Sequence, residues 1–405
     1  MMWRSAVAHQ PEIHEAIKQV AVDAYRDFDE RTVDLVLLFL SSHHIARAAV
    51  ALELLIEQFP SATILGCGAD SVIGAGEEIE DGPGVSLTMA HLPGVTLWPF
   101  HIPRETLVRA GRDPAAWRSI VAAGPDEPSA FLLLGDPLTG HSEELIGGIE
   151  LACPGVIQIG GLASGSREPG GNVLLLDDVV LSEGYIGIGL GGDIEIDTVI
   201  AQGCRPIGEP MFITRCNQNI ILEVDGRPPL EVVNDLFAKA NERERSLFQT
   251  SLFVGVQMNP QRAEIGRGDF LVRNVVGGNP ESGAMAIGAL VEQRQVVQFQ
   301  LRDGETAAED LNLRLTKYVR EAQESGLDTN RAASTTGTVL FSCLGRGKYL
   351  YGVPNHDSDA VRRHLGDVSV SGFFCNGEIG PVEGRTFLHG YTSAFGIFRP
   401  KALRH

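Results

Sequence analysis

The stretch VDLVLLFLSSHHIARAAVALELLIEQFPSATILGCGAD, residues 33–70, decides the fold of this chain. Its first eight residues, 33–40, are an apolar run with the length of a buried strand, and two serines suited to a helix N-cap follow. Residues 43–59 carry a helical pattern that stops at Pro60, and a second apolar run then leads into the glycine-rich GCGAD. Strand, helix, strand and glycine loop in this order predict an α/β unit.

The same order returns twice along the chain. Residues 129–180 give a strand, a helix and a second strand that ends in GGLASG, and residues 337–398 repeat the order with the loop GFFCNGEIG. We therefore predict three copies of one unit. Residues 230–246 form a charged amphipathic helix instead, and the short alternating segments after it are typical of an antiparallel sheet. The predicted fold is α/β with mixed sheets, repeated strand–helix–strand units with glycine-rich loops, and two domains.

The expected domains follow composition. A shift between Pro210 and Pro229 marks the boundary, and we predict an N-terminal helix in residues 1–30, a first domain at 31–220 and a second at 221–405.

Two further helices are predicted. An amphipathic pattern runs from Ala6 to Asp27, and another helix is expected from Ala307 to Glu324 with Thr306 as its N-cap.

Charge and hydropathy exclude several classes of partner. The 405 residues carry a net charge of −19, which repels nucleic acid, and the longest apolar stretch, VDLVLLFL, is too short to span a bilayer. The N-terminus has no signal-peptide pattern. Six cysteines without a CxxC pair indicate reduced thiols. We expect a cytoplasmic protein without a metal or cofactor, and with neither nucleic acid nor membrane as a partner.

Several sequence segments resemble those of a known protein family. LLFLSSHH, ILGCGADSVIG and AQGCRPIGEP resemble the N-terminal FIST pattern, and ILEVDGRPPLEVV, FLVRNVVGG, VVQFQLRD, FSCLGRG and GFFCNGEIGPV resemble the C-terminal one. The resemblance implies a role in prokaryotic signal transduction and binding of small ligands such as amino acids. Too little chain precedes the first strand to hold the F-box of eukaryotic relatives. No kinase, cyclase or receptor segment is recognisable, so a separate signalling partner is expected.

The glycine loops are the first candidate site, because backbone amides freed by glycine can bind an anionic or zwitterionic group. The alternative is that these glycines serve only turns and bulges. The ligand-binding candidates in the loops are Gly66, Gly68, Asp70, Gly160, Ser164, Gly372, Asn376, Gly377 and Glu378.

A histidine near each helix start is the second candidate. His43 or His44, His141 and His356 hold this place in the three copies, where a neutral imidazole could hydrogen-bond a ligand. The alternative is a histidine that is merely tolerated near a cap, and no short ligand spacing supports zinc.

Nucleophilic catalysis is the third candidate. Cys375 or Cys343 could act with His356 or His389 and with Asp357, and Glu378 could supply a carboxylate. The alternative is that Cys375 is a small buried hydrophobe.

Other polar groups carry weaker signals. Arg205 and Arg273 could hold a carboxylate bidentately, or could pair with an internal acid. GIGLGG, residues 187–192, fits GxGxxG, but the segment after it alternates like a strand, which excludes a dinucleotide loop. The acidic GEEIEDG segment, residues 76–82, is interpreted as a solvated loop.

We therefore expect a sensor for a small, amino-acid-like ligand. Two alternatives stay open: a hydrolase or transferase that uses a cysteine or carboxylate, and a ligand-free adaptor that recruits a protein partner.

Overall fold

The computed structural model describes residues 1–26, 28, 31–262, 265–266, 268–327 and 335–401. Contacts divide the chain into two compact units. Unit 1 comprises Met1–Ile200, Asn312–Leu388 and Thr392–His405, and unit 2 comprises Ala201–Leu311 and His389–Tyr391. This division differs from the predicted domain ranges 31–220 and 221–405, because the C-terminal strands pair with N-terminal ones and return the chain to unit 1.

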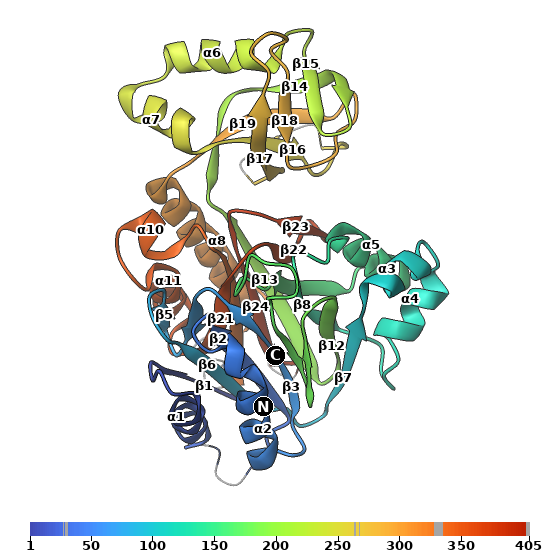
Figure 1. Cartoon of the computed structure of the whole chain (residues 1–405), viewed down its shortest axis with the longest axis vertical. Coiled ribbons are helices and arrows are strands. Elements are labelled where there is room, and N and C mark those ends of the chain that lie inside the picture. Colours follow the sequence, from blue (N-terminus) through green and yellow to red (C-terminus); the bar gives the residue numbers. More distant parts are fainter. Residues whose placement is uncertain (27, 29–30, 263–264, 267, 328–334, 402–405) are drawn as a thin grey trace. The chain divides into compact units, whose positions relative to one another are not determined.

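Unit 1 contains three copies of one chain order; in Figure 1 the first is blue, the second teal to green, and the third mostly orange to red. The first copy runs β1 (Met2–Ala8), α1 (Ile13–Tyr25), β2 (Leu35–Ser41), α2 (Ala48–Gln58), β3 (Thr63–Ala69), β4 (Val72–Gly74), β5 (Glu77–Ile79) and β6 (Val85–His91). The second runs β7 (Val95–Ile102), α3 (Arg104–Ala110), α4 (Pro114–Val121), β8 (Ala130–Gly135), α5 (Ser142–Ala152), β9 (Ile157–Leu162), β10 (Leu174–Leu176), β11 (Val179–Leu181) and β12 (Tyr185–Gly192).

The third copy is interrupted after its first strand. It runs β13 (Ile194–Gln202), then through unit 2 to α8 (Gly304–Glu324), β20 (Gly337–Cys343), α10 (Gly347–Tyr351), α11 (His356–Leu365), β21 (Ser369–Cys375), β22 (Glu378–Val382), β23 (Arg385–His389) and β24 (Thr392–Pro400). The predicted α/β fold with repeated strand–helix–strand units is confirmed.

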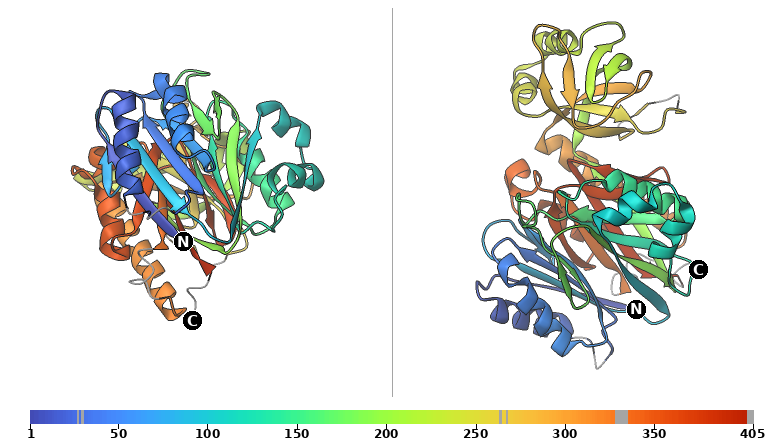
Figure 2. Two further views of the ribbon diagram at one scale, coloured as in Figure 1. Left: turned by 90° about the horizontal axis from the view of Figure 1, so that it is seen from below. Right: turned by 45° about the vertical axis from the view of Figure 1, so that its right-hand side comes forward.

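The three copies exchange hairpins. The sheets have the orders β1-β6-β2-β3-β10-β11, β7-β12-β8-β9-β22-β23 and β13-β24-β20-β21-β4-β5. Each contains a parallel pair: β2 with β3, β8 with β9 or β20 with β21. The short hairpin of each copy extends the sheet of another copy, so β4–β5 joins the third sheet, β10–β11 the first and β22–β23 the second. This exchange is cyclic, and it ties the three sheets around a shared centre (Figure 2).

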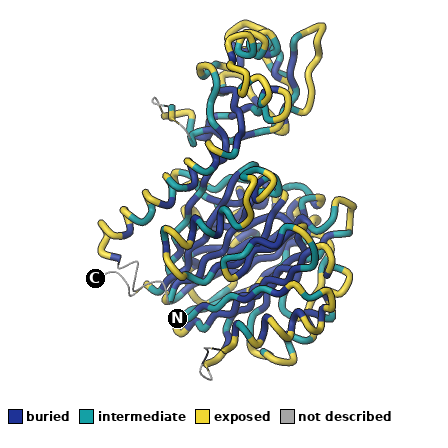
Figure 3. Tube along the Cα trace, turned by 90° about the vertical axis from the view of Figure 1, so that its left-hand side faces the viewer, coloured by how far each residue is buried: buried dark blue, intermediate teal, exposed yellow. Residues whose placement is uncertain are grey.

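The shared centre is apolar. One core cluster draws buried residues from all three sheets, among them Phe39, Leu132 and Phe341. The outer face of the first sheet is covered by α1 and α2, and that of the second by α3, α4 and α5. Every residue of β2 and β8 is therefore buried, which explains their unbroken apolar sequences. Figure 3 shows the strands of unit 1 largely as buried, dark-blue tube.

Unit 2 is a closed antiparallel barrel. Its strands are β14 (Cys204–Asn217), β15 (Ile220–Val224), β16 (Leu252–Gln257), β17 (Phe270–Gly278), β18 (Met285–Ile287) and β19 (Val296–Arg302), with the order β14-β15-β18-β17-β16-β19. Helices α6 (Pro229–Lys239) and α7 (Glu242–Thr250) precede β16. The barrel has its own apolar core, which includes Ile213, Val254 and Phe299.

Three helix predictions need correction. The predicted helix of residues 230–246 is two helices, because Asn241 and Glu244 form a capping box that starts α7. The predicted helix from Ala6 begins later, since residues up to Ala8 pair with β6 as β1. Helix α8 starts at Gly304 rather than after Thr306.

Asp303 caps α8, because its side chain accepts a hydrogen bond from the Thr306 amide at 2.8 Å. In the described part of the chain, no helix is long and apolar enough to cross a membrane.

Candidate functional site

One glycine occupies the same position in the second parallel strand of each copy. Gly66 pairs with Leu38, and Gly160 and Gly372 have equivalent partners. A Cβ atom on Gly66, Gly160 or Gly372 would lie 2.0, 1.9 or 1.9 Å from the carbonyl oxygen of the neighbouring strand. Close approach of two backbones therefore requires glycine here, whatever binds nearby. Ligand contact at these three glycines stays a prediction.

Four residues further on, each copy presents a polar side chain at a strand end. These residues are Asp70, Ser164 and Asn376, and all three stood among the predicted site residues. Asp70 and Asn376 are exposed, whereas Ser164 is buried. The structure thus brings the three predicted glycine loops to equivalent places in one unit.

Hydrogen bonds join these loops directly. The Asp70 amide donates to the Ser164 hydroxyl at 2.9 Å, and that hydroxyl donates to the Phe374 carbonyl at 2.5 Å. The Asn376 side chain donates to the Ala163 carbonyl at 3.1 Å. Ser164 therefore links all three copies at one point.

The neighbouring glycines complete this junction. The Gly68 carbonyl accepts a hydrogen bond from the Ser164 amide at 3.4 Å, and the Gly377 carbonyl accepts one from the Leu162 amide at 2.9 Å. Backbone groups of both predicted glycines thus hold loops of different copies together.

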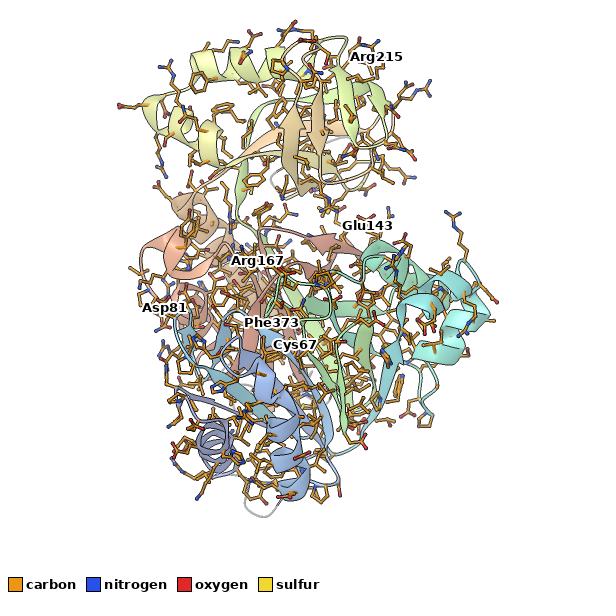
Figure 4. All side chains as sticks on the ribbon, in the orientation of Figure 1. Cys67, Asp81, Glu143, Arg167, Arg215 and Phe373 are labelled. Carbon is orange, nitrogen blue, oxygen red and sulfur yellow. The ribbon has the colours of Figure 1, made fainter. Side chains whose placement is uncertain are left out.

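Unpaired polar atoms remain at the junction. Among the described residues, nothing donates to Asp70 Oδ1 or Asn376 Oδ1. We call Asp70, Ser164, Asn376 and Gly377 the strand-end cluster. Cys67 and Phe373, equivalent residues of the first and third copies, belong to the core of unit 1 (Figure 4).

Glu378 and Cys375 are inward neighbours of this cluster. Glu378 is fully buried and accepts a hydrogen bond from the Thr392 amide at 3.1 Å. The Cys375 thiol donates to the Ser342 carbonyl at 3.3 Å and lies 3.5 Å from Glu378 Oε1. Burial, and then the charge of Glu378, raises the pKa of Cys375 well above its ordinary value. A nucleophilic cysteine needs the opposite shift, so this environment favours the buried-thiol interpretation.

The three predicted histidines all lie at helix starts. His43 is exposed in the turn before α2, and His141 precedes α5 in a left-handed conformation, 3.2 Å from Glu144. His356 is the first residue of α11, where it lies 3.1 Å from Asp357 and stacks on Tyr351 at 3.5 Å. Their contact with a ligand stays a prediction.

A buried ion pair anchors α11. The Nε and Nη2 atoms of Arg346 donate to the carboxylate of Asp357 at 2.8 and 3.1 Å. Burial alone would raise the pKa of Asp357, but Arg346 holds it well below its ordinary value. Ser342 and Ser393 also donate to this carboxylate, at 3.2 and 2.5 Å. With Arg346 as its partner, Asp357 is a structural anion rather than a free base for Cys375.

Glu78 corrects the interpretation of residues 76–82 as a solvated loop. Its side chain is buried, because hairpin exchange places β5 against α11. The Ser358 amide donates to Glu78 Oε1 at 2.8 Å, and the Glu78 amide donates to Asn355 Oδ1 at 2.7 Å. Burial, and then the charge of Asp357, raises the pKa of Glu78 to about 8. The sequence alone gave no sign that one acid of this segment is buried.

Two cavities lie near α11. One of about 620 Å³ includes the predicted residue His356, and one of about 520 Å³ includes Trp3 and Ser358. Arg362 lines both. Among the described residues, no group of three or more His, Cys, Asp or Glu side chains is placed to hold a metal ion.

The two predicted arginines lie in unit 2. Arg205 pairs with Glu244 at 3.1 Å and with Asp303 at 3.6 Å, which agrees with the internal-acid alternative. Arg273, on β17, donates to the Val272 carbonyl at 3.3 Å. Residues 187–192 lie in β12 and lead into β13, so the rejection of a dinucleotide loop agrees with the structure.

Comparisons with known proteins show which domain families the sequence matches. The model of the FIST N domain matches residues 34–227, and that of the FIST C domain matches residues 229–381. An uncharacterised protein of Mycobacterium tuberculosis is 32% identical over 395 residues, 97% of this chain and 98% of that protein. One of Mycobacterium bovis is 33% identical over 395 residues, 97% of each chain.

A solved structure, a cyanuric acid hydrolase from A. caulinodans, aligns over 99% of this chain and 100% of that one, with 10% identity. Its TM-score of 0.31 supports no inference.

Proposed function

The chain belongs to the FIST family, and from this premise we propose that it binds a small zwitterionic metabolite, such as an amino acid, at the strand-end cluster. FIST domains are generally associated with sensing in signal transduction. Occupancy would be passed to a separate signalling protein. The ligand class, this partner and the location in the cytoplasm are parts of the proposal.

One observation carries the proposal: three loops from distant parts of the sequence meet at the buried Ser164, and two of them present an exposed polar group at the equivalent position, Asp70 and Asn376. The free Oδ1 of Asp70 can accept hydrogen bonds from an ammonium group, and the free Oδ1 of Asn376 can accept another. Ligands of α/β proteins commonly bind beyond the carboxyl ends of parallel strands, which is where these residues lie.

The junction also offers a way to transmit binding. Ser164 touches loops of all three copies, so a ligand that shifts Asp70 or Asn376 acts on hydrogen bonds between copies. Such a response requires that the ligand bind two arrangements of the loops with different affinities.

A thermal-unfolding screen with amino acids and organic acids tests the proposal. A ligand at about a hundred times its dissociation constant should stabilise the protein by roughly 2.7 kcal/mol. Asn376→Ala and Asp70→Asn should abolish the shift, whereas Asp81→Asn, an exposed acid on another loop, should preserve it. A shift that survives both cluster variants would place the ligand elsewhere, and no shift across the panel would contradict small-ligand sensing.

A further inference from the structure

Arg302, at the end of β19 in unit 2, has an unusual environment. Its side chain is buried, with 7% of its surface exposed, yet no described residue accepts a hydrogen bond from Nε or Nη2. A buried charge without a partner is strongly unfavourable, so a guanidinium placed in this way points to a missing anion.

Two other buried arginines show what this edge of the side chain binds. Nε and Nη2 of Arg346 donate to the Asp357 carboxylate at 2.8 and 3.1 Å. The same atoms of Arg399 donate to the Asp197 carboxylate at 2.7 and 3.2 Å. Both pairs have the fork geometry that fits the two oxygens of a carboxylate. Arg302 offers the same two atoms without the carboxylate.

The flat face of the Arg302 guanidinium already has a partner, the Tyr391 ring. The Tyr391 ring lies under it, 5.0 Å from the central carbon, and contacts Phe253 at 4.2 Å between ring centroids. The Tyr391 hydroxyl donates to Asn274 Oδ1. This cation–π contact leaves the Nε–Nη2 edge of the guanidinium without a hydrogen-bond partner among the described residues.

Polar side chains from neighbouring strands share this face. Arg302 and Gln300 alternate along β19 and so point to the same side. Gln300 lies opposite Phe253, and Phe253 lies opposite Asn274. The core-facing residues of β19, such as Phe299, point the other way, into the barrel. Two amide side chains therefore stand on the face that carries the unpaired arginine.

We propose that Arg302, in contact with the Tyr391 ring, and with the Gln300 and Asn274 amides on the same face of the sheet, is a binding site for the carboxylate of a small metabolite. The site lies within unit 2, and it does not rest on the function proposed for the strand-end cluster of unit 1. Because Nε and Nη2 are both sheltered from solvent, a small carboxylate fits this edge better than a group on a macromolecular surface.

Titration calorimetry on the full chain tests this site with acetate, propionate and succinate, each against its neutral amide at constant ionic strength. At least one carboxylate should bind saturably, and its amide should bind at least about tenfold more weakly, since it lacks the charge that strengthens bonds to the guanidinium. Failure of every carboxylate to saturate below about 50 mM, a range weaker than ordinary ligand affinities, would overturn the proposal.

Variants locate the binding. Arg302→Lys keeps the charge but loses the fork, and should weaken the carboxylate at least about tenfold. Arg243→Lys, a matched change at an exposed arginine of unit 2, should leave the affinity unchanged. Circular dichroism should show that each variant is folded. If Arg302→Lys does not fold, Tyr391→Leu, which removes the ring under the guanidinium, replaces it. Unchanged affinity in the folded variant would overturn the site.

Discussion

The backbone amide of Asp70 donates a hydrogen bond to the side-chain oxygen of Ser164 at 2.9 Å, across 94 residues of sequence. The same hydroxyl donates to the Phe374 carbonyl. Ser164→Ala should therefore leave a donor and an acceptor without partners and destabilise the protein by about 1–3 kcal/mol. Urea unfolding measures this, with the exposed Ser42→Ala as the matched control. A loss within about 0.5 kcal/mol, the usual range for surface changes, would show that the bridge is unimportant.

Close strand approach predicts opposite effects for two glycine substitutions. In Gly160→Ala the new Cβ would lie 1.9 Å from the Leu133 carbonyl oxygen, so backbone must move, and we expect a loss of about 3 kcal/mol or more. In Gly147→Ala, on the exposed face of α5, the Cβ meets nothing within 4 Å and should gain about 0.5–1 kcal/mol of helix stability. Equal tolerance of both changes in thermal unfolding would contradict the packing argument.

The glycine loops show how far sequence reasoning reaches. The three copies could be predicted, because strands buried on both faces carry apolar runs and the second parallel strand of each copy contains glycine. The convergence of Asp70, Ser164 and Asn376 depends on the cyclic exchange of hairpins, which no local pattern contains. The positions of the loops were therefore predictable, and the hydrogen bonds between them were not.

The burial of charged side chains could not be predicted from the sequence either. Glu78 lies among acids whose pattern predicts a solvated loop, and Arg302 is the last residue of a strand. No sequence pattern indicates that either side chain is buried. Pairing between distant segments decides both cases, since β5 reaches α11 and β19 lies beside β16. Arg205 and Arg273 were predicted to hold a carboxylate because they lie in glycine-bearing segments, yet Arg205 pairs with the internal acids Glu244 and Asp303. Local composition does not report which arginine lacks a partner.

The environment of Cys375 predicts low thiol reactivity. Burial and Glu378 raise the pKa of Cys375, so the native protein at pH 8 should resist alkylation there by iodoacetamide. Cys343 is half-buried and serves as the internal comparison, and unfolded protein should label at both positions. Mass spectrometry of peptides from a time course reads out each site. Rapid labelling of Cys375 in the native state would contradict this picture and revive a nucleophilic role.

Glu78 predicts a specific dependence of stability on pH. Its pKa is raised from 4.5 in the unfolded reference to about 8 in the native state, so between these values the folded protein holds a proton that the unfolded chain has lost. Stability therefore falls as pH rises through this window, by at most about 1.4 kcal/mol for each pH unit, and the loss is complete above about pH 8. Below pH 4.5 both states are protonated, so stability no longer changes with the titration of Glu78 and this contribution is fully present.

Comparison with Glu78→Gln isolates this effect, because glutamine keeps the shape and can still accept the hydrogen bond from the Ser358 amide. The free energy of unfolding of the wild type, minus that of the variant, should decline from pH 5 to pH 8, which cancels the titration of other groups such as Glu80. Glu57→Gln, on the exposed side of α2, should give a flat difference. Urea unfolding at several pH values measures both. A flat difference for Glu78→Gln would mean that the native carboxylate is already ionised beside Asp357, and that water or a cation reaches the base of α11.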